Sequence, residues 1–348
     1  MTEGLISLER NDAKKSNIIE ILKLVSPGTV LRTAIDDISR AGMGALIVVD
    51  SEKLKEISEG GFRVNSKLTA QRIVELAKMD AAIILSSDLT KILYANVLLV
   101  PGINISTSET GTRHKAAERT AKQAKTLVIA ISERKKKITL YHGNLKYILK
   151  NPEELLSRAT ETLQILEKQK EIFNELISNL NVLEISGLVM VSDVCNVLQR
   201  AEMVTRTAKM IERYLIELGK EGAIIKMRLR ELLKNVDREK NLILKDYSAR
   251  ENMLGELNFD ELLESEDMAR LLFSLASEEK VQSRGYRILS KTKLDNKIIK
   301  KLFGSFTDLE NILSVDEERL NRVLGVDSDN FRKEISSVKE QIMMAKKI

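Results

Sequence analysis

Hydrophobic residues follow different patterns in the first part of the chain and in the rest. Over the first 150 residues, short apolar runs rich in β-branched side chains are bounded by Gly, Ser and charged residues, as in buried strands. Such runs cover residues 44–50, 81–85, 92–100 and 126–132, and residues 138–142 and 145–149 alternate around Gly143-Asn144 as a hairpin does. Segments with helical spacing lie between them. The pattern predicts an α/β domain over residues 1–150, with a central mixed sheet of five or six strands flanked by helices.

After Pro152 the chain has no convincing strand pattern. Apolar residues recur at helical spacing over residues 153–180, 194–218 and 224–244, with Gly219 and Gly222 marking a stop between the last two segments. We therefore expect an all-α middle domain over residues 151–278. Residues 279–348 contain short amphipathic segments with short connections and predict an all-α C-terminal domain, with helices at 297–303, 308–313, 317–324 and 331–343.

The composition is that of a globular protein, because 43% of the residues are hydrophobic and 31% are charged. A length of 348 residues suits two or three domains. The single Cys195 excludes a disulfide framework and a cysteine-rich zinc site. No apolar run approaches the roughly 20 residues that a membrane span needs, and the charged N-terminal stretch lacks the apolar core of a signal peptide. We expect a cytoplasmic protein.

One short stretch carries the most informative chemistry. A loop rich in Ser, Thr and Gly, residues 106–112, runs into Arg113, His114 and Lys115 and then into an alanine-rich helical segment. Free N–H groups at a helix start, hydroxyl groups and cations together favour an anion, and here they predict a bound triphosphate. Asp80, just before a predicted strand, is placed to bind Mg²⁺ or Mn²⁺ and to meet a sugar hydroxyl. Taken singly, each feature is also typical of a capping residue or an ordinary helix start.

Other candidate motifs have plainer interpretations. Gly42-Met43-Gly44 precedes a strand instead of following one, so we interpret it as a turn and not as a dinucleotide-binding loop. The charged run 133–137 is interpreted as a solvated loop, with a contact to the nucleotide or to a partner as the alternative. The chain has no GxxxxGK[ST] loop, which argues against an ordinary ATPase, and only two histidines, His114 and His142.

The start of the C-terminal segment is strongly basic. Between Lys280 and Lys301 there are eight basic residues and a single acid, Asp295. This excess either contacts nucleic-acid phosphates without reading bases or forms a solvated positive face. The short helices suit paired helix-hairpin-helix motifs, in which a glycine-bearing turn offers N–H groups to phosphates. The second turn reads Leu324-Gly325-Val326-Asp327, with Asp in place of a second Gly, and the first, at 294–296, has no Gly.

Two segments together resemble a known pair of motifs. The run Asp80-Ala81-Ala82 and the segment 111–119 are similar to the Asp-Gly-Ala and Arg-His-Arg motifs of the diadenylate cyclase family, and specifically of its members that scan DNA integrity. The similarity covers nearly the full length and continues through residues 24–29, 60–62, 232–248 and 284–287. Three residues depart from the family pattern: Ala81 replaces Gly, Lys115 replaces Arg and Ala116 replaces Thr. An Ala where positive φ is required costs roughly 1 kcal/mol.

The resemblance implies an enzyme that condenses two ATP molecules into cyclic di-AMP and two pyrophosphates. It implies that Asp80 is the catalytic residue and binds Mg²⁺ or Mn²⁺, and that Leu99 lies against the adenine. The implied nucleotide-binding residues are Ala81, Leu99, Thr112, Arg113, His114, Lys115 and Ala116. Because one pocket holds one ATP, two pockets must face each other across a symmetric interface, and the resemblance implies a homo-octamer.

The resemblance also implies a function for the remaining two domains. The middle domain is expected to be a spine, and the helix-hairpin-helix domain is expected to bind branched or junction DNA and to regulate the cyclase as a DNA-integrity checkpoint. The expected DNA contacts are Arg284, Arg287, Lys291, Lys293, Lys297, Lys300, Lys301 and Gly325. The alternative, motivated by Ala81 and Ala116, is a non-catalytic protein that senses nucleotides or binds DNA structures.

Overall fold

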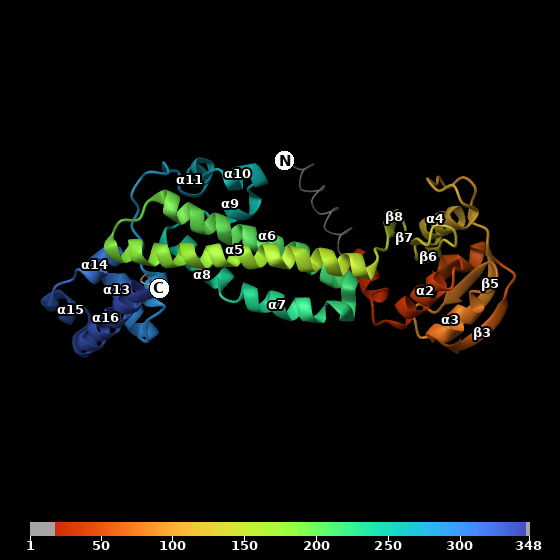
Figure 1. Ribbon diagram of the computed structural model, residues 1–348, viewed down its shortest axis with the longest axis horizontal. Coiled ribbons are helices and arrows are strands. Elements are labelled where there is room, and N and C mark those ends of the chain that lie inside the picture. Colours follow the sequence, from red (N-terminus) through yellow and green to blue (C-terminus); the bar gives the residue numbers. More distant parts are fainter. Residues whose placement is uncertain (1–17, 346–348) are drawn as a thin grey trace. The chain divides into compact units, whose positions relative to one another are not determined.

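The computed structural model describes residues 18–345 and divides into two compact units (Figure 1). One unit is Met1–Ala159 with Glu212–Ile225, and the other is Thr160–Ile211 with Lys226–Ile348. The N-terminal stretch that we expected not to be a signal peptide lies outside the described residues. Among the described helices, none is long and apolar enough to cross a membrane.

The first unit contains an eight-stranded mixed sheet. Its strands are β1 (Ala45–Val49), β2 (Ser58–Glu59), β3 (Phe62–Lys67), β4 (Ala82–Leu85), β5 (Lys91–Leu99), β6 (Leu127–Ile131), β7 (Ile138–His142) and β8 (Leu145–Ile148). They follow the order β2-β5-β4-β1-β6-β7-β8, with β3 also paired to β5. The β1–β4 pair is parallel and the other pairs are antiparallel, so the predicted mixed sheet is confirmed. The expected number of strands was too low, because β2 and β3 are largely exposed and lack an apolar run.

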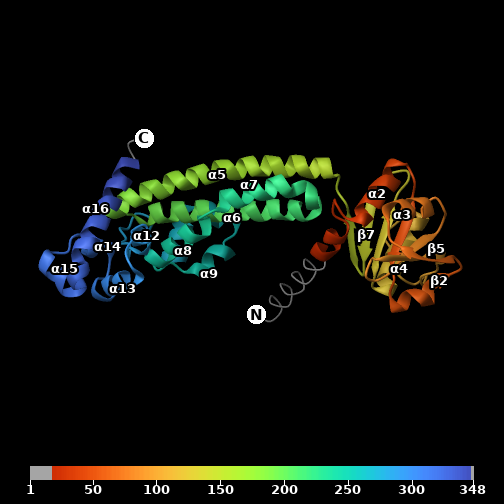
Figure 2. The same cartoon turned by 90° about the horizontal axis from the view of Figure 1, so that it is seen from below.

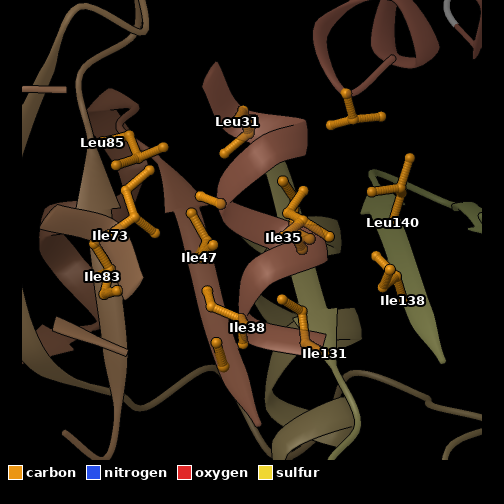
Figure 3. Close-up of a cluster of buried hydrophobic side chains, with 14 of the residues drawn as sticks. Leu31, Ile35, Ile38, Ile47, Ile73, Ile83, Leu85, Ile131, Ile138 and Leu140 are labelled. Carbon is orange, nitrogen blue, oxygen red and sulfur yellow. The ribbon is translucent and has the colours of Figure 1, made fainter. Parts of the chain in front are cut away.

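Helices cover both faces of this sheet. They are α2 (Val30–Arg40), α3 (Ala70–Leu76), α4 (Thr112–Ala124) and the short 3-10 helix η1 (Glu52–Ile57). On one face, Ile35 of α2 and Ile73 of α3 share an aliphatic core with Ile47 of β1 (Figure 3). On the other face, Ala117 and Ala121 of α4 pack into a second core. Small side chains let α4 lie close to the sheet, and this fixes where the N-terminus of α4 emerges.

The rest of the described chain is helical, as predicted. The helices are α5 (Pro152–Ser186), α6 (Val191–Leu218), η2 (Gly219–Gly222), α7 (Ala223–Leu233), α8 (Val236–Asp246), α9 (Glu251–Glu256), α10 (Phe259–Leu263), α11 (Ser265–Phe273), α12 (Tyr286–Leu289), α13 (Asn296–Ser305), α14 (Leu309–Leu313), α15 (Glu317–Leu324), η3 (Gly325–Asp327) and α16 (Ser328–Ala345). In both views α5 lies alongside α6 (Figures 1 and 2). The single helix expected over residues 224–244 is two helices, because Asn235 adopts a left-handed φ of 67° between α7 and α8.

The limits of the two units differ from the three expected domains. The first unit extends past residue 150 to Ala159 and also takes in the turn between α6 and α7, Glu212–Ile225. Residues 279–348 fall in the same unit as most of the middle helices. Helices α5 and α6 therefore each contribute residues to both units.

Candidate active site

The N-terminus of α4 opens into a cavity. The expected loop and helix start are confirmed, because the residues before α4 lack regular structure and the helix begins at Thr112 after Gly111. Gly111 offers no side-chain cap, so the first N–H groups of α4 are free to bind a ligand. The cavity has a volume of about 560 Å³. Its lining comes from the loop before α4, the start of α4, the β6–β7 loop, β7 and β8: Glu109, Thr110, Gly111, Thr112, Arg113, His114, Ser132, Glu133, Arg134, Lys135, Lys137, Thr139, Lys146 and Ile148.

The charged run 133–137 is exposed, as its interpretation as a solvated loop requires. Four of its residues also line the cavity, which favours the alternative that part of the run contacts the nucleotide. The antiparallel pairing of β6 with β7 brings their connecting loop to the edge of the sheet where α4 begins. Lys146 on β8 was not singled out from the sequence, because its position follows only from the pairing of β7 with β8.

Gly44 makes a close contact that its interpretation as part of a turn did not predict. A Cβ atom on Gly44 would overlap the guanidinium group of Arg113, so the side chain of Arg113 lies directly against the Gly44 backbone. Leu46 of β1 is paired with Ala82 of β4 in parallel register. Because β1 and β4 are parallel, Gly44 just before β1 and Asp80 just before β4 lie at the same end of these two paired strands. The fold thus brings Asp80 and Arg113 to the same edge of the sheet.

Asp80 and Ala81 form a tight bend before β4. Ala81 has a φ of 69°, which confirms that the position requires the left-handed region and that its Ala is strained. Asp80 is exposed, and within the described residues its carboxylate has no hydrogen-bond or ion-pair partner. The bend leaves this carboxylate exposed just before β4.

The Asp80 carboxylate could bind a metal ion only if substrate oxygens supply further ligands. Within residues 18–345 no group of three or more His, Cys, Asp or Glu side chains is placed to hold a metal. Mg²⁺ often uses one or two carboxylates and completes its shell with water and substrate phosphates. The exposed carboxylate of Asp80, which is not itself among the residues that line the cavity, could supply one such ligand.

Glu109 organises the charges at the cavity wall. Its carboxylate accepts hydrogen bonds from Lys146 at 2.5 Å and from the Tyr141 hydroxyl at 2.7 Å. Burial opposes ionisation, but these two hydrogen bonds and the Lys146 charge hold the pKa of Glu109 below its usual value. Burial lowers the pKa of His114, and the nearby charges of Arg113 and Lys146 lower it further, partly offset by Glu109. His114 is therefore a neutral hydrogen-bonding group at neutral pH.

The other expected nucleotide contacts do not line the cavity. Lys115 is exposed on α4 and Ala116 is half-buried there. The Leu99 side chain is only 8% exposed and packs in the core under α4, so a contact between Leu99 and adenine would have to use its backbone. Of the expected set, the cavity walls contain Thr112, Arg113 and His114.

One expected DNA contact is wrong. Arg287 is fully buried, and its guanidinium pairs with Glu184 at 2.5 Å and bonds Asn181. Asp246 accepts the N–H groups of Tyr286 at 2.6 Å and of Arg287 at 2.9 Å. Arg287 thus joins α5, α8 and α12 and cannot reach a phosphate.

The remaining basic residues are more accessible. Lys291 directs its ammonium to Asn181 at 2.9 Å, and burial lowers its pKa. The other cations are exposed on or near α12 and α13: Arg284, Lys293, Lys297, Lys300 and Lys301. Gly325, with a φ of 59° and a ψ of −123°, forms the turn between α15 and α16, a conformation open essentially to glycine alone.

Comparison with known proteins points to one family. A family model for the nucleotide-binding region of the DisA bacterial checkpoint controller matches residues 32–145, and one for its linker region matches residues 149–284. The DNA integrity scanning protein DisA of Acetivibrio thermocellus is 46% identical over 330 residues, which cover 90% of this chain and 92% of that protein. Proteins of the same name from Clostridioides difficile and Clostridium kluyveri are 42% and 40% identical, cover 91% and 96% of this chain, and are themselves covered over 92% and 99% of their length.

Proposed function

This chain belongs to the DisA family and is a diadenylate cyclase, and on that premise we propose that the cavity at the start of α4 holds the ATP triphosphate. Thr112, Arg113 and the first N–H groups of α4 would bind the phosphates, and neutral His114 would add a hydrogen bond. Lys135 and Lys137 would supply further positive charge from the β6–β7 loop.

The observation that carries this proposal is the position of Arg113 against Gly44. The parallel pairing of β1 with β4 supports it further, because Gly44 and Asp80 precede these two strands at the same edge of the sheet, where Arg113 lies against Gly44. Asp80 would hold Mg²⁺ or Mn²⁺ near the ribose 3′-hydroxyl, which attacks the α-phosphate of a second ATP and releases pyrophosphate. When bound, the ion neutralises charge on the phosphoryl oxygens. Arg113 would stabilise the charge that develops there.

The reaction needs two of these sites. Each chain contributes one such cavity, and cyclic di-AMP contains two nucleotides joined head to tail. Two copies would therefore face each other across a two-fold axis, within the octamer that the family resemblance implies. Dilution below the assembly threshold should abolish product formation.

The cyclase proposal is tested by product analysis. Purified protein incubated with ATP and Mg²⁺ or Mn²⁺ should yield cyclic di-AMP and pyrophosphate by mass spectrometry, whereas Asp80→Asn should yield neither while keeping its oligomeric state. Asp50→Asn is the matched control, because Asp50 follows the opposite end of β1. Undiminished product from Asp80→Asn would contradict the role of Asp80.

We further propose that the C-terminal helices bind branched DNA and restrain the cyclase. Support comes from the exposed cations on and around α13, and from the glycine turn between α15 and α16, which suits a helix-hairpin-helix motif. Because such contacts are made to phosphates, binding should weaken steeply with salt.

Lysine substitutions distinguish DNA contacts by the lysines of α13 from a general effect of the protein's positive charge. Replacing Lys297, Lys300 and Lys301 by Gln should reduce the slope of log K against log salt by about 3 for junction DNA. Lys209→Gln is the control: Lys209 is an exposed lysine on α6, and its replacement should leave the slope unchanged. Equal effects of the two changes would contradict the assignment of this surface.

A further inference from the structure

Strand β8 separates the candidate nucleotide cavity from a helix end. Lys146 and Ile148 of β8 line the cavity. Leu145 and Tyr147, which alternate with them, pack against the aliphatic core on the other face of the sheet. A shift of β8 that begins on the face of Leu145 and Tyr147 would therefore also move the side chains on its other face, which form the cavity wall.

The C-terminal end of α6 lies behind β8. Glu217 of α6 is only 4% exposed, and its carboxylate accepts hydrogen bonds from the Tyr147 hydroxyl at 2.7 Å and from the Lys150 N–H at 2.9 Å. Ile216 packs against the same core as Tyr147. Burial and then the Glu217 carboxylate raise the pKa of the Tyr147 phenol, so the hydroxyl keeps its proton and remains a donor. A buried carboxylate that lost this donor would be left partly unsatisfied.

A second contact anchors the same helix end. The N–H of Lys220 donates to the Pro27 carbonyl at 3.2 Å. A Cβ on Gly219 would lie 2.6 Å from that carbonyl oxygen, so this close approach requires glycine. The end of α6 is thus held at two points within the unit that contains the cavity, whereas α6 begins at Val191 in the other unit.

We propose that Glu217 is a positioning residue for the cyclase: through Tyr147 it sets the position of β8, and with it Lys146, which serves as an additional phosphate-binding cation. Lys146 pairs with Glu109 at 2.5 Å, and both residues line the cavity. A triphosphate would compete with Glu109 for this cation. The position of β8 then decides how well Lys146 can reach the phosphates.

This inference rests on the proposed function, because it makes α6 the element through which the proposed DNA-binding helices act on the cyclase. Helix α6 is one continuous element of 28 residues, and rigid secondary elements are among the structures that carry energetic coupling between distant sites. The Tyr147–Glu217 hydrogen bond is the point at which such a displacement reaches the cavity wall.

A double-mutant cycle tests the coupling without DNA. Tyr147→Phe removes only the hydroxyl and should raise the KM for ATP about fivefold, at the lower end of typical coupling effects. Lys146→Met should raise KM roughly tenfold, as expected for the loss of one charged contact. In the Lys146→Met background, Tyr147→Phe should change KM by less than about twofold, because the residue through which it acts is gone. Tyr214→Phe, which removes a hydroxyl elsewhere on α6, is the control and should leave KM unchanged.

The outcomes are distinct. An unchanged KM in Tyr147→Phe, or equal effects of Tyr147→Phe with and without Lys146, would overturn the proposal. If Tyr147→Phe does not fold, Glu217→Gln provides the same cycle, since Gln keeps an acceptor oxygen but loses the charge.

DNA and product measurements separate this inference from the proposed function. Junction DNA should lower the rate of cyclic di-AMP synthesis by the wild-type protein. The fold-inhibition of Tyr147→Phe by the same DNA should be at least threefold smaller, a difference within the usual range of coupling. If wild-type protein makes no cyclic di-AMP, the proposed function fails, and the same cycle is then measured as the dissociation constant of a fluorescent ATP analogue. Additive effects in that measurement would overturn the positioning role independently.

Discussion

Replacing Ala81 by Gly should stabilise the sheet unit and improve ATP use. Ala81 adopts a φ of 69° immediately before β4. A left-handed conformation costs an L-residue about 1–2 kcal/mol, whereas glycine adopts it freely but gives up about 0.4–1 kcal/mol through the added freedom of the unfolded chain. The difference predicts a net stabilisation of about 1 kcal/mol, or about 2–4 °C in Tm for a unit of this size.

The measurement must report on the sheet unit alone, because the chain has two units and no Trp to serve as a local probe. Hydrogen exchange followed by mass spectrometry across a urea series provides this, through peptides that cover β1 and β4. Ala116→Gly is the matched control with opposite sign, since Ala116 lies inside helix α4 and glycine there should cost about 0.5–1 kcal/mol. If Ala81→Gly is no more stable than the wild type, the reasoning from backbone strain is wrong.

Three further predictions follow from single contacts. Gly44→Ala should raise the KM for ATP at least tenfold in a steady-state assay, because its methyl group displaces the guanidinium packed there, whereas Gly102→Ala, which meets only ordinary contacts, should not. Arg287→Met should destabilise the helical unit by about 3–5 kcal/mol in urea unfolding, because it leaves buried carboxylates without their ion-pair partner. The control, Lys293→Met at an exposed position, should cost less than about 0.5 kcal/mol. Burial and a nearby carboxylate raise the pKa of Asp246 to about 7, so its protonated form stabilises the fold at low pH and this contribution is lost as pH rises from 3.8 towards 7; Asp246→Asn should flatten that dependence in unfolding experiments between pH 4 and 8.

Hydrophobic periodicity predicted the sheet and the helical region, because strands such as β1 and β6 are buried on both faces and their apolar runs are unbroken. Strand β3 could not be found in this way, since one face of it is exposed and its sequence, FRVNSK, is mostly polar. The anion loop was predicted because its donors are contiguous in sequence. Gly44 and Lys146 were missed because they reach the cavity only through strand pairing.

Arg287 shows a different limit of sequence reasoning. Within a run of basic residues, nothing in the sequence distinguishes a solvated cation from a buried one, and the partner Glu184 is 103 positions away. The pairing depends on α5 and α12 packing together, which periodicity does not specify. Counting the basic residues in such a cluster therefore gives too many phosphate contacts, because the residues that the fold buries cannot bind a phosphate.

The three departures from the family motif have unequal consequences. Lys115 is exposed on α4, Ala116 is half-buried there, and neither lines the cavity, so replacing the family's Arg and Thr removes no group from its wall. Ala81 differs, because its cost is in the backbone and is present whether or not ATP is bound. Glycine adopts this left-handed conformation without the penalty, so it would hold the bend that carries Asp80 at lower cost. We therefore expect Ala81→Gly to raise cyclase activity, whereas Lys115→Arg and Ala116→Thr should change it less than about twofold, the range expected for surface substitutions.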